Sequence, residues 1–247
     1  TVPLGEDPEA VAGRYRWLET AAAQGTFAAP RVLERGEGWL HLEGLVGWRP
    51  LADCFPGLSD AEARRVGETA GRALAVLHGQ ARAGDGPPVA REEVLPGLSP
   101  GKGCEETAVT VHGDFGLGNL LWRSEGSPSL AVVDPWPAPF LEALPPRRRA
   151  PALIDLALFV ASLEGIYPLR RWRPGARRRS RICRGAFLGA YAAARARSVD
   201  EGAVRRAAAW ILRLYAGHPA PARHPGHRLR RGQWRRRARA LEEGGTS

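Results

Sequence analysis

One stretch of the sequence, residues 111–122, combines apolar runs with polar residues at a fixed spacing. An apolar run leads into a glycine-rich loop that carries Asp114 and, five residues later, Asn119. Another apolar run follows directly, and a further one, residues 130–133, ends in Asp134. Short apolar runs bounded by glycine and polar residues are typical of buried strands. The pattern therefore predicts three oxygen-bearing side chains at junctions between strands and loops.

These side chains suit phosphoryl transfer, in which a protein holds Mg²⁺ on phosphate oxygens and orients a hydroxyl. Mg²⁺ keeps several waters and takes one or two carboxylates from the protein. Asp134 and Asn119 would supply the metal ligands, which leaves Asp114 free to accept the proton of a substrate hydroxyl. The alternative is plain turn chemistry, which any one of these residues alone would favour. Their combination beside apolar runs favours the chemical interpretation.

The order His-x-Asp-x-x-x-x-Asn, followed by a further Asp, resembles the catalytic loop and metal site of kinases. Gly113 after His112, and Leu120-Leu121 after Asn119, make the stretch similar to the aminoglycoside phosphotransferase and choline kinase family. The resemblance implies an α+β, protein-kinase-like two-lobe fold. It also implies ATP or GTP and Mg²⁺ as cofactors, and a small-molecule alcohol as the acceptor. In these terms Asp114 is the catalytic base, and His112 supports the loop.

Residues 114–116 also read Asp-Phe-Gly, the sequence in which protein kinases place a metal-binding Asp. In that register Asp114 would bind the metal, and a catalytic loop would have to precede it. Residues 95–113 contain no His-x-Asp and no Asn. The register with Asp114 as the base and Asp134 as a metal and nucleotide ligand, together with Asn119, satisfies every role.

Residues 1–47 resemble a reduced or N-terminally truncated β-rich N-lobe. Asp7-Pro8-Glu9 is typical of a helix start, and the helix is expected to end at Gly25. Two strands are expected around a turn at residues 36–38. The resemblance makes Glu9 the candidate partner of a phosphate-holding Lys, in a structural role. A Glu favoured by the helix dipole explains the same residue equally well.

Residues 43–47 resemble the hinge between the two lobes. Backbone groups of Glu43 and Leu45 would there bind the adenine. A plain exit from a strand into a loop explains these residues equally well.

The remaining residues, 48–247, are expected to form a mainly helical C-lobe. Capping boxes at 59–62 and 198–201 each predict a helix start. A buried, almost wholly apolar helix is expected over residues 151–160. Its one carboxylate, Asp155, needs hydrogen-bond donors if it is buried. The resemblance gives Asp155 a structural role, as a brace of the catalytic loop.

Charge is distributed unevenly along the chain. Residues 1–140 carry 12 Lys and Arg against 19 Asp and Glu, whereas residues 141–247 carry 24 against 7. A solvated surface is the favoured interpretation, since no recognised nucleic-acid-binding module accompanies the basic half. Nucleic acid is therefore not the expected partner. The basic half favours a neutral or anionic acceptor over a polycationic one, and the sequence indicates no oligomeric state.

Cysteine and histidine usage predicts no disulfide framework and no zinc site. The cysteines, Cys54, Cys104 and Cys183, are odd in number and widely spaced, which fits a reducing cytoplasm. His218, His224 and His227 lie in a stretch rich in Pro and Gly, with no Cys or carboxylate beside them. No apolar run approaches the about 18 to 20 residues that a membrane span needs.

Kinases of this type hold the nucleotide with a glycine-rich loop and a Lys on a following strand. Neither precedes Glu9, and Lys102 lies in a Gly- and Pro-rich stretch without the spacing of a phosphate-binding motif. A chain that lacks this clamp should turn over poorly. Two functions therefore stay open: a small-molecule kinase, and a non-catalytic relative that uses the same pocket, or the Arg-rich face, to bind a partner. A third and weaker alternative is an Arg-rich nucleic-acid-binding protein that uses the basic C-terminal half.

Overall fold

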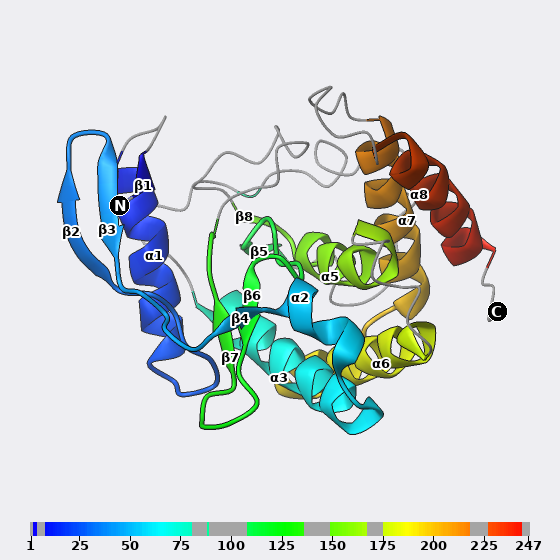
Figure 1. The fold of residues 1–247 in the computed structure, drawn as a ribbon, viewed down its shortest axis with the longest axis horizontal. Coiled ribbons are helices and arrows are strands. Elements are labelled where there is room, and N and C mark those ends of the chain that lie inside the picture. Colours follow the sequence, from blue (N-terminus) through cyan, green and yellow to red (C-terminus); the bar gives the residue numbers. More distant parts are fainter. Residues whose placement is uncertain are drawn as a thin grey trace.

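The computed structural model describes residues 2–3, 8–80, 88, 108–135, 149–166, 175–217 and 227–243. Lys102, Cys104, His218 and His224 lie outside these ranges. Small antiparallel sheets and one helix occupy the N-terminal side, and long helices occupy the other (Figure 1). The mixed helix and sheet content predicted from the sequence is confirmed. Within the described part of the chain, no helix has the length and apolar character needed to cross a membrane.

The N-terminal side consists of helix α1 (Pro8–Ala22) and a three-stranded sheet in the order β1-β3-β2. The strands are β1 (Val2–Pro3), β2 (Val32–Gly36) and β3 (Trp39–Leu42), and both pairings are antiparallel. Gly25 and Gly38 have positive φ angles of 79° and 72°, which favour glycine. Gly25 follows α1, and Gly38 lies between β2 and β3, as predicted.

Two further sheets carry the candidate site. Strands β4 (Arg49–Pro50), β6 (Leu120–Trp122) and β7 (Leu130–Val132) form an antiparallel sheet in the order β4-β6-β7. Strands β5 (Ala108–Thr110) and β8 (Arg149–Pro151) form an antiparallel pair. The prediction that Pro151 begins a helix was wrong, because Pro151 pairs with Ala108 and helix α5 (Leu153–Ala161) begins after it.

The helical part comprises α2 (Leu51–Cys54), a 3-10 turn (Phe55–Gly57), α3 (Asp60–Gly79), α5, a π-helical turn (Ser162–Ile166), α6 (Ala176–Arg195), α7 (Glu201–Gly217) and α8 (His227–Glu242). The capping box at Ser59 and Glu62 is present. The second predicted box is not: Asp200 caps α7, because its Oδ1 accepts the N–H of Ala203 at 3.0 Å. Asp200 therefore takes the capping place expected of Ser198.

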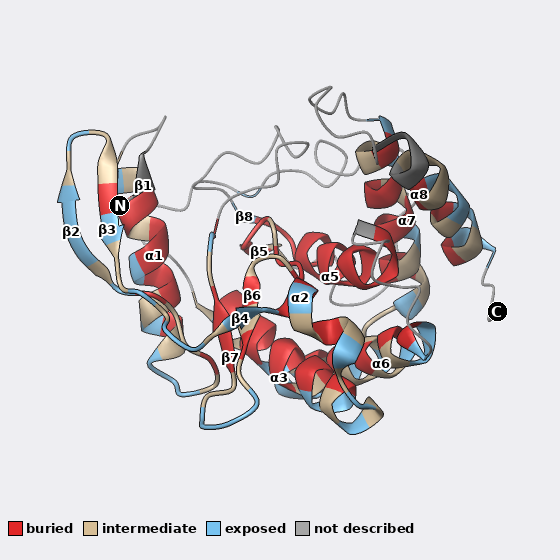
Figure 2. Ribbon diagram, viewed as in Figure 1, coloured by how far each residue is buried: buried red, intermediate tan, exposed pale blue. Residues whose placement is uncertain are grey.

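The core is centred on α5, in which every residue is buried (Figure 2). Helices α3 and α6 pack closely, and glycines make this approach possible. A Cβ atom at Gly67 would lie 2.2 Å from the carbonyl oxygen of Cys183, and one at Gly71 would lie 2.4 Å from that of Phe187. Only glycine fits at these positions, and the packing places α3 and α6 beside each other.

The basic helix α8 is not simply a solvated surface. Trp234, Ala238 and Leu241 are buried, whereas Arg235, Arg236 and Arg239 are exposed. Arg237 pairs with Glu164, a buried carboxylate of the π-helical turn that also pairs with Arg184 at 3.2 Å. An ion pair below the surface fixes the helix in place, which the spacing of charges along α8 did not predict.

Candidate active site

The loop of residues 112–119 connects β5 to β6 through two tight turns. Gly113 is buried with a φ of 85°, a conformation that suits glycine. The carbonyl of Asp114 accepts the N–H of Gly116 at 2.8 Å, and that of Gly116 accepts the N–H of Asn119 at 3.0 Å. The turns bring the Asn119 amide nitrogen to 2.8 Å from Asp114 Oδ2. Asp114 and Asn119 are therefore direct neighbours.

His112 is fully buried and links this loop to the segment before Asp134. Its Nδ1 accepts the backbone N–H of Asp114 at 3.3 Å, so the ring proton lies on Nε2, which donates to the carbonyl of Val133 at 3.0 Å. Burial lowers the pKa of His112 to about 4, which keeps the ring neutral. In this geometry His112 holds the loop and does not transfer a proton.

Asp155 anchors the same loop from helix α5. Its Oδ2 accepts the N–H of His112 at 2.7 Å, and its Oδ1 accepts the N–H of Gly113 at 2.8 Å. His78 Nε2 lies 3.0 Å from Oδ2, and His78 Nδ1 lies 2.8 Å from the hydroxyl of Tyr191. Burial opposes ionisation of Asp155, but the bond from His78 and the neighbouring donors leave its pKa below the ordinary value.

Sequence reasoning missed this extension of the anchor. His78 on α3 and Tyr191 on α6 both belong to helices whose apolar periodicity is the dominant signal. Their polar atoms meet only because α3 packs against α6 and both approach α5.

Phe115, the central residue of Asp-Phe-Gly, anchors the loop through aromatic contacts. It is fully buried, and its ring centroid lies 6.0 Å from that of Phe159 on α5 and 6.4 Å from that of Phe187 on α6. The N–H of Leu117 is bonded to Ser162 Oγ at 3.2 Å. The apolar and polar contacts together fix the loop on the helical core.

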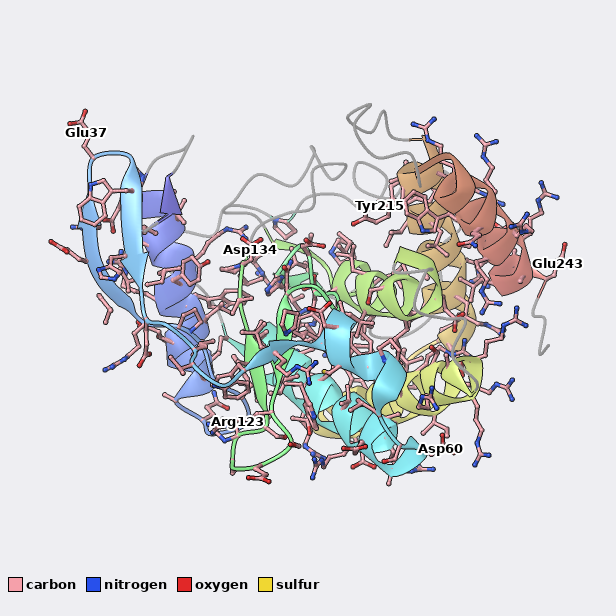
Figure 3. All side chains as sticks on the ribbon, viewed as in Figure 1. Glu37, Asp60, Arg123, Asp134, Tyr215 and Glu243 are labelled. Atoms are coloured by element: carbon pink, nitrogen blue, oxygen red, sulfur yellow. The ribbon has the colours of Figure 1, made fainter. Side chains whose placement is uncertain are left out.

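Asp134 follows β7 and comes directly after Val133. The N–H of Val133 donates to the carbonyl of Asn119 at 3.0 Å, which aligns the start of this segment with the end of the loop. Asp134, which is labelled in Figure 3, has a φ of 53°, and the residue is exposed. Aspartate adopts this left-handed conformation more readily than most residues.

The carboxyl group of Asp114 titrates in an unusual range. Burial raises its pKa to about 6, the bond from Asn119 opposes the shift, and the charges of Asp134 and Asp155 add to it. A base with a pKa near the working pH accepts a proton effectively. Asp114 therefore has the electrostatic setting of a general base.

Asn119 and Asp134 have the chemistry of a Mg²⁺ site completed by phosphate. Asn119 uses its amide nitrogen on Asp114, which leaves the amide oxygen as a ligand. Asp134 offers an exposed carboxylate. Among the described residues, no group of three or more His, Cys, Asp or Glu could hold a metal ion by itself. The donor set fits Mg²⁺ that is shared with substrate phosphates, which needs only one or two carboxylates.

Glu9 and Glu43 make their observed contacts with surface arginines. The half-exposed carboxylate of Glu9 pairs with Arg16 and Arg35. The carboxylate of Glu43 pairs with Arg31 at 3.1 Å, and its N–H donates to the carbonyl of Arg31 at 2.8 Å. The nucleotide-related roles of Glu9, Glu43 and Leu45 stay predictions.

Solved structures with a similar fold are known, whereas comparison of the sequence alone finds no match. No protein-family model matches the sequence, and no curated protein matches it either. A solved structure described as glucosamine kinase in complex with glucosamine, ADP and inorganic phosphate resembles it with a TM-score of 0.61 at 20% identity, over 93% of this chain and 67% of that chain. Crystal forms B and A of glucosamine kinase give 0.61 and 0.60 at 21% identity, over 97% of this chain and 70% and 68% of theirs. At such identity the likeness shows a shared fold.

Proposed function

We propose that this chain transfers the terminal phosphoryl group of ATP to a hydroxyl of a small molecule, with Mg²⁺ as the required metal. One observation carries the proposal: Asp114, Asn119 and the Asp134 segment are joined by hydrogen bonds on a fold shared with glucosamine kinase. The solved neighbour was crystallised with ADP, which supports ATP as the donor.

The proposed roles follow from the geometry. Asp114 orients the acceptor hydroxyl and takes its proton as the oxygen bonds to the terminal phosphorus and the bond to the ADP oxygen breaks. Asn119 and Asp134 would hold Mg²⁺, which neutralises phosphate charge during transfer. His112 and Asp155 keep the backbone of the loop in place.

The acceptor is proposed as a small alcohol, and an amino sugar is the first compound to test because the solved neighbour contains glucosamine. The basic C-terminal half favours a neutral or anionic acceptor over a polycationic one. A panel of neutral, anionic and amino sugars therefore separates these classes. We further propose that residues 1–47 and 48–247 act as the two lobes, with nucleotide contacts from Glu43 and Leu45.

A thermal-shift experiment tests the nucleotide and metal assignment. Mg²⁺·ADP should stabilise the wild-type protein, by about 2.7 kcal/mol at a concentration one hundred times Kd. Asp134→Asn should abolish this response, because Asn keeps the tolerance for positive φ but removes the charge. Asp53→Asn changes an exposed aspartate on α2 and should leave the response intact. A full response in Asp134→Asn would contradict the metal assignment.

The alternative is that the protein binds ligand without transferring a phosphoryl group. It is kept because Lys102, the single lysine of the sequence, has no phosphate-binding motif around it. Stabilisation by Mg²⁺·ADP with no ADP release from ATP in the presence of any acceptor would favour this alternative. ADP release that depends on an acceptor hydroxyl would exclude it.

A further inference from the structure

The π-helical turn (Ser162–Ile166) follows α5 and contacts both the loop of residues 112–119 and helix α8. Figure 1 shows α5 between β5 and α7, with α8 on the far side of α7. π-helical turns are rare and occur frequently at functional sites. At this turn the last described helix and the proposed catalytic loop contact the same short segment.

Ser162 makes the contact on the loop side. Its hydroxyl donates to the carbonyl of Phe159 at 2.7 Å and accepts the N–H of Leu117 at 3.2 Å. Because the hydroxyl proton is used on Phe159, an oxygen lone pair is left to face the loop. A Cβ atom at Gly116 would lie 3.4 Å from the Cβ of Ser162, so the loop packs directly on the turn. Ser162 is buried, which shields its bond to the loop from water.

Trp234 and Arg237 make the contacts on the α8 side. The indole N–H of the buried Trp234 donates to the carbonyl of Gly165, and Arg237 donates to the carboxylate of Glu164. A Cβ atom at Gly165 would lie 3.3 Å from the ring of Trp234, so the ring also packs on the turn. Trp234 and Arg237 are about one helical turn apart and share one face of α8. That face therefore holds both a main-chain and a side-chain group of the turn.

Glu164 is held from two helices. Its side chain is 4% exposed, and it pairs with Arg184 of α6 at 3.2 Å as well as with Arg237 of α8. A buried carboxylate without partners is costly, so the position of Glu164 depends on these guanidinium groups. The neighbouring carbonyl of Leu163 accepts the hydroxyl of Ser180 on α6 at 3.3 Å. Consecutive residues of the turn therefore contact the loop, α6 and α8.

We propose that Ser162 is a positioning residue of the loop, and that helix α8 sets its place through the indole and guanidinium contacts with the turn. Leu117, which Ser162 holds, lies in the chain between the proposed base Asp114 and the proposed metal ligand Asn119. A shift of Leu117 changes the spacing of these two groups. The effect on turnover rests on the proposed function, whereas the effect on the loop does not.

Amide hydrogen exchange tests the effect on the loop. Ser162→Ala removes the acceptor of the Leu117 N–H, and exchange at Leu117 should become about threefold to tenfold faster, as expected for one lost hydrogen bond. Trp234→Phe keeps an aromatic ring but removes the N–H that bonds the turn, and it should also speed exchange at Leu117. The amide of Gly113, which the carboxylate on α5 holds, is the internal reference, because a general loss of stability would speed both amides.

Turnover tests whether α8 acts through Ser162. Arg237→Ala should lower kcat for acceptor-dependent ADP release by about threefold to tenfold, and Arg237→Lys, which keeps the charge beside Glu164, should restore most of it. Arg236→Ala is the matched control, because Arg236 is exposed on the same helix, and it should leave kcat unchanged. Ser162→Ala combined with Arg237→Ala should be no slower than Ser162→Ala alone, because both substitutions act on one contact.

Unchanged exchange at Leu117 in a folded Ser162→Ala protein would overturn the positioning role. Equal acceleration at Leu117 and Gly113 in Trp234→Phe, or additive losses of kcat in the double variant, would overturn the transmission from α8. If the wild type releases no ADP with any acceptor, the proposed function fails, and the exchange rates alone decide whether α8 sets the position of the loop. Trp234→Phe keeps the test decisive even if Arg237→Ala does not fold.

Discussion

The loop of residues 112–119 and the segment of residues 133–135 hold their carboxylates in different ways. Asp155, a fully buried group on α5, bonds two consecutive amides of the loop. The segment bears an exposed aspartate, and its hydrogen bonds join Val133 to Asn119 and Pro135 to Arg14 of α1. The proposed base is therefore part of the helical core, whereas the proposed metal ligand also depends on the N-terminal helix. Changes at the two regions should separate stability from ligand binding.

The largest stability effect is expected at Asp155. Asp155→Asn should lower the free energy of unfolding by about 3 kcal/mol, because it breaks a buried charged network. Urea denaturation measures the loss, and Asp134→Asn should cost far less. An equal loss of free energy of unfolding in the two variants would contradict the distinction between Asp155 as a core anchor and Asp134 as a surface ligand.

The pH dependence of stability tests whether ionised Asp155 contributes to the free energy of unfolding. The pKa of Asp155 is lowered on folding, so its contribution is present above the unfolded value of 3.8 and is lost as the pH falls through the folded value. The wild type should therefore lose stability more steeply than Asp155→Asn as the pH falls from 3.8 through the folded value. Parallel acid unfolding curves would contradict the ionised state of the anchor.

Catalysis is expected to follow the ionisation of Asp114. Because the pKa of this base is raised to about 6, kcat/KM should rise with pH through that region and level off above it. The loss below it should be about tenfold per pH unit, as for a single essential base. The pH profile of kcat/KM measures this. A profile that is flat between pH 5 and about 7 would remove Asp114 from the role of base.

A smaller effect is expected at the far end of the loop anchor. Tyr191→Phe removes the hydroxyl that is bonded to His78, at a cost of about 1 kcal/mol. Thermal unfolding should detect the change, and the Mg²⁺·ADP response should persist. Loss of that response would show that the hydrogen bonds around Asp155 position the proposed metal ligand Asp134 as well as the proposed base Asp114.

The smallest effect is expected at Glu9, whose pairs with Arg16 and Arg35 lie at the surface. Glu9→Gln should change the free energy of unfolding by less than about 0.5 kcal/mol. Nucleotide response should be measured in the same samples. If the response disappears, Glu9 has the phosphate-related structural role that the family resemblance implies.

Local features of the fold could be predicted from the sequence. The turn at Gly38 and the capping box at Ser59 each depend on residues within a few positions of one another, and both are observed. The spacing within residues 112–119 likewise suffices to make Asp114 and Asn119 neighbours. At the second capping box the same local rule selected the wrong residue, since both Ser198 and Asp200 are good caps.

Contacts between distant elements could not be predicted in this way. Arg14 and Pro135 are 121 positions apart. Helical spacing from Val11 puts Arg14 on the buried face of α1 and Arg16 on the exposed face, but it does not indicate which group Arg14 contacts. Glu164 likewise gives no local sign that it binds Arg237 of α8. Both contacts arise from helix packing, in which a buried charge must find a partner.

The most direct test of the proposed function is acceptor-dependent release of ADP from Mg²⁺·ATP by the wild type and by Asp114→Asn. The substitution preserves shape and removes the base, so kcat should fall by about a hundredfold to ten-thousandfold. Mg²⁺·ADP should still stabilise the variant, because Asn119 and Asp134 remain. Equal turnover in Asp114→Asn and the wild type would contradict the assignment of Asp114 as the base.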